Sequence, residues 1–257
     1  ANFSREHRCV RKDGQIIWAN ITLSVVTGPD GRPAHIISVI QDITERKQAV
    51  EQLNHLAQHD ALTGLPNRNL FRDRLAHAMA RAKRNDLMMA LMFFDLDRFK
   101  EINDTLGHTA GDQVLQAVAK MMQESLREVD TISRLGGDEF TLILEDIAHV
   151  DRVTALVQKI LQIFSNPLVV EGREIYVTTS IGITLYPFGV DDIDALLQTA
   201  DIAMYHAKEE GRNTYEFYAP EMNVHAAANL DMEGLLRHAL ERQEFLLHYQ
   251  PKVAVKS

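Results

Sequence analysis

The chain has 257 residues, of which 46% are hydrophobic and 25% charged, a composition that is typical of a globular protein and excludes a disordered or collagen-like chain. Its 36 acidic and 27 basic residues give a formal net charge of −9, which argues against a nucleic-acid-binding surface. The single cysteine, Cys9, excludes an internal disulfide and favours a reducing compartment.

We therefore expect a cytoplasmic location. The longest apolar run, residues 87–94, has eight residues, far fewer than the roughly 20 that a membrane-spanning helix needs, so we expect no membrane contact within this sequence. The sequence begins without Met and stops within a pattern at Tyr249-Gln250-Pro251. We interpret it as a piece of a longer protein, whose other segments could anchor it to a membrane.

The first 43 residues show strand and hairpin signals. Two strand-like runs, residues 16–21 and 35–40, follow the turn-forming pairs Asp13-Gly14 and Asp30-Gly31. Residues 44–58 then place apolar side chains at heptad positions among charged ones. This pattern fits either a short coiled coil or a solvated linker helix.

A longer periodic region follows. Helical apolar stripes are expected at residues 71–82, 114–122, 150–164 and 193–207. Strands are expected at residues 87–94 and 176–185, with a hairpin formed by residues 131–135 and 140–145. The order strand, helix, hairpin, helix, strand, helix predicts an α+β fold of ferredoxin-like or palm type, with an antiparallel-rich sheet and helices on one face.

Acidic residues lie at two places in this predicted sheet, the end of one strand and the turn of the hairpin. Asp95 follows the buried strand, and Asp138 and Glu139 follow Gly136-Gly137 in the hairpin. In a palm-like sheet these positions can be adjacent, so Asp95 and Asp138 could share a Mg²⁺ ion that also binds phosphate oxygens. Taken singly, Asp95 also fits a helix cap and Asp138 a turn residue.

The hairpin carries the intact motif Gly136-Gly137-Asp138-Glu139-Phe140, and the chain resembles the GGDEF diguanylate cyclases of bacterial signalling. Supporting motifs lie at residues 60–68, 95–104, 107–112 and 200–213. The resemblance implies that two GTP molecules condense to cyclic di-GMP and two pyrophosphates in a homodimer, with Mg²⁺ or Mn²⁺ as cofactor. It also implies a domain with a central antiparallel-rich sheet and surrounding helices.

The ends of the chain resemble other signalling domains. Residues 11–18 and 41–47 resemble the end of a PAS sensor domain, and residues 230–253 resemble the start of an EAL phosphodiesterase domain. The implied organisation is a partial PAS-like domain at 1–43, a signalling linker helix at 44–58, a GGDEF domain at 59–220 and a truncated EAL-like domain at 229–257.

The resemblance also implies roles for individual residues. Asp95, the backbone carbonyl of Leu96 and Asp138 would bind metal. Asp138 would also assist deprotonation of the ribose hydroxyl, with Glu139 beside it, and Lys100 would act on transition-state charge. The residues implied in GTP binding are Asn103 and Asp112 for guanine, Lys208 and Arg212 for the outer phosphates, and Phe99 in a segment near the phosphates.

Arg127 and Asp130 lie just before the signature strand, where the family has a product-inhibition site for cyclic di-GMP. An ordinary surface ion pair fits the same two residues. The competing function is a catalytically silent GTP-binding domain that regulates an attached EAL phosphodiesterase. The sequence itself carries no Glu-Ala-Leu signature, so we do not expect phosphodiester hydrolysis from this chain.

Overall fold

The computed structural model describes residues 2–29, 32–188 and 192–223, together with residues 239, 242 and 244. The chain divides into two compact units, Ala1–Gly64 and Leu65–Ser257. Among the described residues, none of the helices combines the length and the apolar character needed to cross a membrane. The predicted helix and strand after residue 229 lie outside the described residues.

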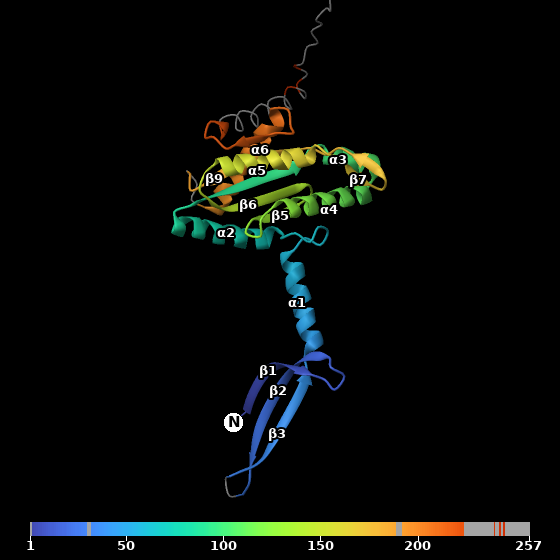
Figure 1. The fold of residues 1–257 in the computed structure, drawn as a ribbon, viewed down its shortest axis with the longest axis vertical. Helices are drawn as coiled ribbons and strands as arrows, with labels where there is room; N and C mark the ends of the chain where they lie inside the picture. The colour runs from blue at the N-terminus through green and yellow to red at the C-terminus, as the bar shows by residue number, and fades with distance from the viewer. Residues whose placement is uncertain are drawn as a thin grey trace, which may run out of the picture. The chain divides into compact units, whose positions relative to one another are not determined.

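Unit 1 contains a three-stranded antiparallel sheet in the order β1-β2-β3 (Figure 1). The strands are β1 (Asn2–Val10), β2 (Ile16–Thr27) and β3 (Pro33–Asp42), and the sheet is followed by helix α1 (Thr44–Gln58). The predicted turn at Asp13-Gly14 is confirmed, and Gly14 has a φ of +86° there. The predicted turn at Asp30-Gly31 lies outside the described residues.

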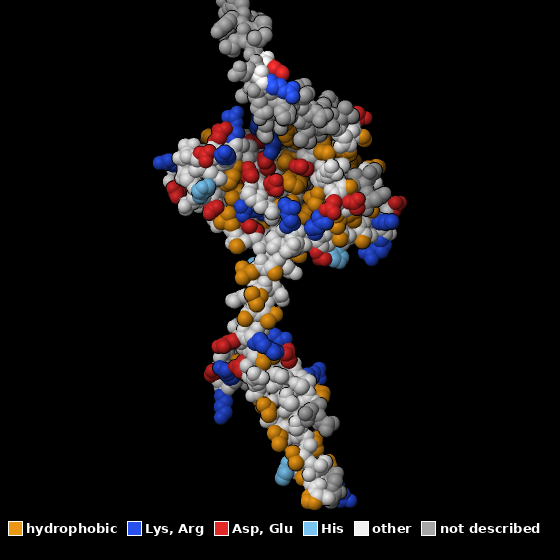
Figure 2. Space-filling view, turned by 180° about the vertical axis from the view of Figure 1, so that it is seen from behind, with side chains coloured by type: hydrophobic (Ala, Val, Ile, Leu, Met, Phe, Trp, Pro, Cys, Tyr) orange, Lys and Arg blue, Asp and Glu red, His pale blue; other side chains and the backbone are white. Residues whose placement is uncertain are grey.

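The start of α1 is fastened to the sheet by polar contacts. The Arg11 guanidinium pairs with the Asp42 carboxylate at 2.5 Å, and Asp42 accepts a hydrogen bond from the Thr44 backbone N–H at 2.9 Å. Further along α1, the heptad side chains Val50 and Leu53 are exposed, and Figure 2 shows hydrophobic side chains at the surface of this unit. A helix over residues 44–58 is thus confirmed, and its apolar heptad positions are exposed.

Unit 2 is built on a five-stranded sheet in the order β10-β9-β4-β6-β5. All neighbouring strands are antiparallel except β9 and β10, so the prediction of an antiparallel-rich α+β domain is confirmed. The strands are β4 (Met88–Leu96), β5 (Thr131–Gly136), β6 (Glu139–Ile147), β9 (Thr179–Tyr186) and β10 (Tyr215–Phe217).

The predicted helical stripes all lie on helices of unit 2. The helices are α2 (Arg68–Asn85), α3 (Phe99–Leu106), α4 (His108–Ser125), α5 (Asp151–Phe164) and α6 (Ile193–Glu209). A small hairpin of β7 (Leu168–Val170) and β8 (Arg173–Ile175), which the periodicity does not predict, precedes β9. The predicted strand 176–185 begins only at Thr179, and Tyr176 is exposed.

Helices cover both faces of the sheet, so the expectation of helices on one face is wrong. Leu91 and Phe93 of β4 pack in one cluster with α2 and α6. Met92 and Phe94 point to the opposite face because side chains alternate along a strand, and they are fully buried as well; α5 contacts β6 and crosses the sheet (Figure 1). Residues 88–94 of β4 are all apolar, and such a run cannot leave either face of the sheet to water.

Candidate functional site

The end of β4 brings the acidic residues together. In the sheet register, Asp95 lies opposite Glu139 of β6 on one side and Ser180 of β9 on the other. Because Glu139 directly follows the β5–β6 turn, the signature hairpin and the end of the buried strand share one edge of the sheet. The adjacency expected from the sequence for Asp95 and Asp138 therefore exists in the fold.

The Asp95 carboxylate is only 15% exposed and forms an ion pair with the Lys208 ammonium of α6. Burial raises the pKa of Asp95 above its ordinary value, the Lys208 charge opposes this change, and the negative charges of Asp138 and Asp97 add to it. The pKa of Glu139 is raised for the same leading reason, burial, and by the neighbouring charge of Asp201. Several carboxylates thus repel one another at this edge of the sheet, with the charges of Lys208 and Arg68 opposing the repulsion.

This arrangement suits a divalent cation. Carboxylate oxygens are the ligands that Mg²⁺ prefers, and Mg²⁺ is usually held by one or two carboxylates plus substrate phosphates. Among the described residues, no group of three or more His, Cys, Asp or Glu side chains forms a ready-made metal cluster. The mutual repulsion at Asp95 and Asp138 is what a bound cation would relieve, so the residues present fit a metal shared with a phosphate ligand.

The signature turn depends on its two glycines. Gly136 has a φ of +148° and Gly137 a φ of +54°, and a Cβ at either position would meet no atom within 4 Å. The requirement for glycine is therefore conformational rather than steric. The Arg134 side chain holds the turn by donating to the Gly137 carbonyl at 3.0 Å and 2.7 Å.

A second group of predicted residues lies where α3 packs on α4. Asn103 of α3 is half-buried, and its Cγ would lie 3.0 Å from a Cβ built on Gly111 of α4. Asp112, the next residue, is exposed. The absence of a side chain at Gly111 thus makes room for the Asn103 amide beside Asp112. The sequence analysis did not predict this role. Its signal was the glycine itself, because glycine is unfavourable in a helix interior.

Two further predicted residues occupy α3. Phe99 is 8% exposed, and its Cζ atom would lie 3.2 Å from a Cβ on Gly111, so its side chain packs between the two helices. Lys100, the next residue of α3, is exposed. The structure brings Asn103, Asp112 and Phe99 together around Gly111.

The end of α6 supplies the predicted cations. Lys208 lies in the last turn of α6 and pairs with Asp95, whereas the exposed Arg212 follows the helix with a φ of +66°. The residue that sequence reasoning missed here is Asp97, which is 7% exposed and accepts a hydrogen bond from the backbone N–H of Asn213. Its signal was available, because residues 95 and 97 share a face of an extended chain.

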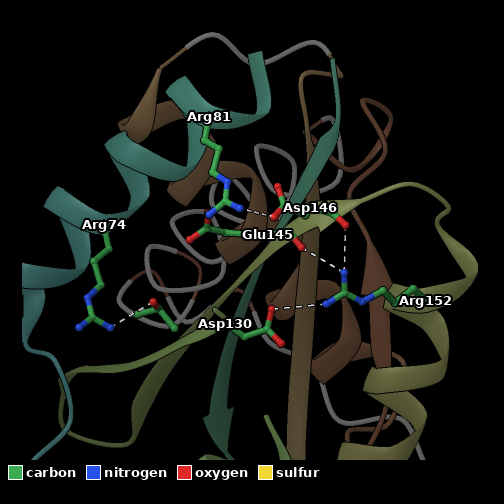
Figure 3. A network of polar contacts seen from close by, with 7 residues as sticks. Arg74, Arg81, Asp130, Glu145, Asp146 and Arg152 are labelled. Carbon is green, nitrogen blue, oxygen red and sulfur yellow. Dashed lines mark hydrogen bonds and ion pairs between the residues drawn. The ribbon is translucent and has the colours of Figure 1, made fainter. Parts of the chain in front are cut away.

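Asp130 belongs to a network of polar contacts at the opposite end of β6 (Figure 3). Its side chain is 3% exposed and pairs with Arg152 at 3.6 Å. The Arg152 guanidinium also donates to the carbonyls of Glu145 and Asp146, and Arg81 pairs with the Asp146 carboxylate at 2.6 Å. Arg127 is exposed and contacts Asp130 through its backbone. The alternative interpretation, a surface ion pair between Arg127 and Asp130, is therefore wrong, because the buried Asp130 carboxylate pairs with Arg152 instead.

Comparison with known proteins identifies this class of domain. The family of the "Diguanylate cyclase, GGDEF domain" matches residues 57–214, and the chain belongs to this family. A solved structure of the GGDEF domain of TpbB (YfiN) from Pseudomonas aeruginosa shares the fold, with a TM-score of 0.64 and 39% identity over 66% of this chain and 99% of that chain. The coiled coil and GGDEF domain of DgcB from Caulobacter crescentus in complex with c-di-GMP shares it as well, with a TM-score of 0.63 and 29% identity over 68% of this chain and 93% of that chain.

Curated relatives carry different activities. The chain is 42% identical over 92% of its length to the bifunctional diguanylate cyclase/cyclic di-GMP phosphodiesterase MucR of P. aeruginosa, and it spans 36% of MucR. It is 39% identical over 82% of its length to the cyclic di-GMP phosphodiesterase PdeR of Escherichia coli and spans 32% of PdeR. It is 43% identical over 63% of its length to the diguanylate cyclase TpbB of P. aeruginosa and spans 38% of TpbB.

Proposed function

We propose that this chain is a diguanylate cyclase that condenses two GTP molecules into cyclic di-GMP and two pyrophosphates. The observation that carries the proposal is the placement of Asp95 and Glu139 opposite each other at one sheet edge, with Lys208 paired to Asp95. The relatives named as cyclases and the intact Gly136-Gly137-Asp138-Glu139-Phe140 motif support it. The reaction forms two phosphodiester bonds, breaks two bonds to pyrophosphate and releases one proton from each 3′-hydroxyl.

In this proposal, Asp95, Asp138 and the backbone carbonyl of Leu96 hold a Mg²⁺ or Mn²⁺ ion. When bound, the metal neutralises charge on the phosphates and orients them. Asp138, assisted by Glu139, accepts the proton that leaves the ribose 3′-hydroxyl. A carboxylate whose pKa is raised above its ordinary value is better matched to this transfer near neutral pH, and the pKa of Glu139 is raised in this direction.

The remaining predicted residues recognise the nucleotide in this proposal. Asn103 and Asp112 bind the guanine edge, because an amide both donates and accepts hydrogen bonds and a carboxylate accepts from the N1–H and amino groups. Lys208 and Arg212 bind the outer phosphates. Lys100 acts on charge in the transition state, and Phe99 maintains the packing under Asn103.

Catalysis in this proposal requires a homodimer, since each 3′-hydroxyl attacks the α-phosphate held by the other subunit. The exposed apolar positions Val50 and Leu53 of α1 support pairing through that helix under the control of a sensor formed with residues 1–43. Charge substitutions at both positions should reduce dimer formation and turnover together. If they change neither, α1 is a linker only.

Product inhibition through Arg127 and Asp130 is part of the proposal. Because Asp130 is paired with Arg152, cyclic di-GMP would have to compete with Arg152 for this carboxylate. Arg127→Ala should relieve inhibition by added product, and unchanged inhibition would rule the site out.

The second candidate is a GTP-binding regulatory domain that controls an EAL phosphodiesterase, the remainder of which would follow residues 229–257. Its support is that relatives of similar identity are named as phosphodiesterases, PdeR among them. In this case the same site binds GTP without turnover.

The deciding experiment incubates the purified chain with GTP and Mg²⁺ at several protein concentrations and separates the nucleotides by chromatography. We expect cyclic di-GMP whose rate of formation rises more steeply than linearly with protein, and which disappears with EDTA or in Asp138→Ala. Asp73→Ala, which removes an exposed carboxylate of α2, is the matched control and should keep its activity. GTP binding by a dimer without any product would instead favour the regulatory function.

A further inference from the structure

Asp97 is a buried carboxylate with no role in the proposed chemistry. It lies directly after β4 and is 7% exposed. Its Oδ1 atom accepts a hydrogen bond from the Ser180 hydroxyl at 2.7 Å, and its Oδ2 atom accepts one from the Thr178 hydroxyl at 2.7 Å and one from the Asn213 backbone N–H at 3.1 Å. One side chain therefore joins the end of β4, the start of β9 and the loop that follows α6.

The loop held by Asp97 has an unfavourable backbone conformation. Gly211, Arg212 and Asn213 have φ values of +115°, +66° and +49°. The left-handed region is sterically unfavourable for Arg212 and less so for Asn213, and such conformations persist where the surroundings impose them. The Arg212 N–H donates to the Ala207 carbonyl at 3.2 Å, and the Asn213 N–H donates to Asp97, so both ends of the strained pair are fastened.

We propose that Asp97 is a positioning residue that sets Arg212 and Lys208 against the triphosphate. This inference rests on the proposed function, in which these two cations bind the outer phosphates of GTP. Arg212 immediately precedes the anchored Asn213, and Lys208 pairs with Asp95, two residues before Asp97. Both carboxylate oxygens of Asp97 are already engaged with the protein, which assigns it to holding the loop rather than to binding a metal.

A carboxylate suits this position for a physical reason. It offers about four acceptor sites and no donor, so it can accept from two hydroxyls and one backbone N–H, and hydrogen bonds to an ionised acceptor are stronger than neutral ones. Asp97→Asn would keep the shape of the side chain but replace one acceptor oxygen by a donor amide. That amide would face either the hydroxyl of Ser180 or the N–H of Asn213.

The test compares the affinities of each variant for GTP and for GMP, which lacks the outer phosphates. We expect the preference for GTP over GMP to fall about tenfold in Asp97→Asn, the equivalent of about 1.4 kcal/mol, while GMP affinity stays unchanged. Thr178→Val, which removes one donor to Asp97, should lower the preference in the same direction. The matched control is Thr184→Val, which removes a hydroxyl of β9 that is 2% exposed and bonds to Thr199.

The outcomes separate this proposal from the cyclase activity. An Asp97→Asn protein that melts at a lower temperature but keeps the full preference for GTP would overturn the positioning role and leave the cyclase proposal standing. A wild-type chain that prefers GTP over GMP yet forms no cyclic di-GMP would contradict the cyclase, and the tenfold fall in Asp97→Asn would still support the positioning role. If Asp97→Asn does not fold, an unchanged preference in Thr178→Val overturns the proposal.

Discussion

Gly111→Ala should separate nucleotide recognition from folding stability. An added Cβ would overlap the Oδ1 atom of Asn103, and it would lie 3.0 Å from the Cγ atom of that residue and 3.2 Å from Cζ of Phe99. The Asn103 amide must therefore move by on the order of 1 Å to restore ordinary contact distances. Because Asn103 is half-buried, its side chain has room to move away, and the fold should survive.

The expected magnitudes differ for the two properties. Alanine in a helix interior is favoured over glycine by about 1 kcal/mol, whereas overpacking costs typically 1–3 kcal/mol, so the free energy of unfolding should fall by no more than about 2 kcal/mol. A displacement of 1 Å in a positioned group can cost about 100-fold in function. We therefore expect GTP affinity to fall by roughly that factor if Asn103 reads guanine.

The assay is GTP binding by calorimetry together with urea denaturation of Gly111→Ala, Asn103→Ala and the double variant. Once Asn103 is truncated, the clash with its amide is gone, so Gly111→Ala should cause no further loss of GTP affinity and should recover stability. Such non-additivity is the signature of residues in contact. Wild-type GTP affinity in Gly111→Ala, or losses that simply add in the double variant, would refute the reasoning.

Three further predictions concern other parts of unit 2. Gly182→Ala places a Cβ against the backbone of α6, where it would overlap the Ala200 carbonyl and lie 2.8 Å from the Ala203 carbonyl carbon. Because backbone atoms cannot rotate away, we expect the free energy of unfolding in urea to fall by more than about 3 kcal/mol. Near-wild-type stability would contradict this packing. Burial raises the pKa of Glu145 from its ordinary value of 4.5, so the stability that Glu145 contributes is present at low pH and is lost as the pH rises through the folded-state pKa. Glu145→Gln should therefore melt at a higher temperature than wild type at pH 7 and lose that advantage at pH 4. A difference in melting temperature that does not change with pH would argue against burial of this carboxylate as its cause. Arg152→Ala leaves Asp130 buried and unpaired, which should cost about 3 kcal/mol; adding Asp130→Ala should restore part of that loss, and a further decrease would show that the pair is not the source.

Much of the fold was predictable because its signals are local. The stripes of α2 and α6 and the apolar run of β4 follow from the side-chain periods of 3.6 and 2 residues. The hairpin of β5 and β6 follows from Gly136-Gly137, whose positive φ values few other residues adopt readily. The apolar run of β4 indicates that both faces of the sheet are covered, but which helices cover each face was not predictable in this way, because it depends on where α2, α5 and α6 pack after the chain has crossed the sheet.

The candidate site divides along the same line. Asp95, Asp138 and Lys208 could be picked out by motif and spacing, since each lies at a recognisable element end. Asp97 could be noticed beside Asp95 but not given a purpose, because its partner Asn213 lies 116 residues away. Gly111 is close to Asn103 in sequence, but only the packing of α3 on α4 shows that the two residues meet. Asp130 illustrates the opposite case, in which a surface pair with Arg127 was one interpretation of a local pattern and the fold pairs Asp130 with Arg152 instead.

The sequence by itself determined the family-defining motif, the helices and strands that carry it, and the types of side chain available for phosphate, guanine and metal. Only the tertiary structure decided which of these side chains meet. The register of β4 with β6 sets Asp95 opposite Glu139, and the return of α6 to the sheet places Lys208 on Asp95. Periodicity and turn chemistry are properties of neighbouring residues, whereas pairing across a sheet depends on the packing of the whole domain.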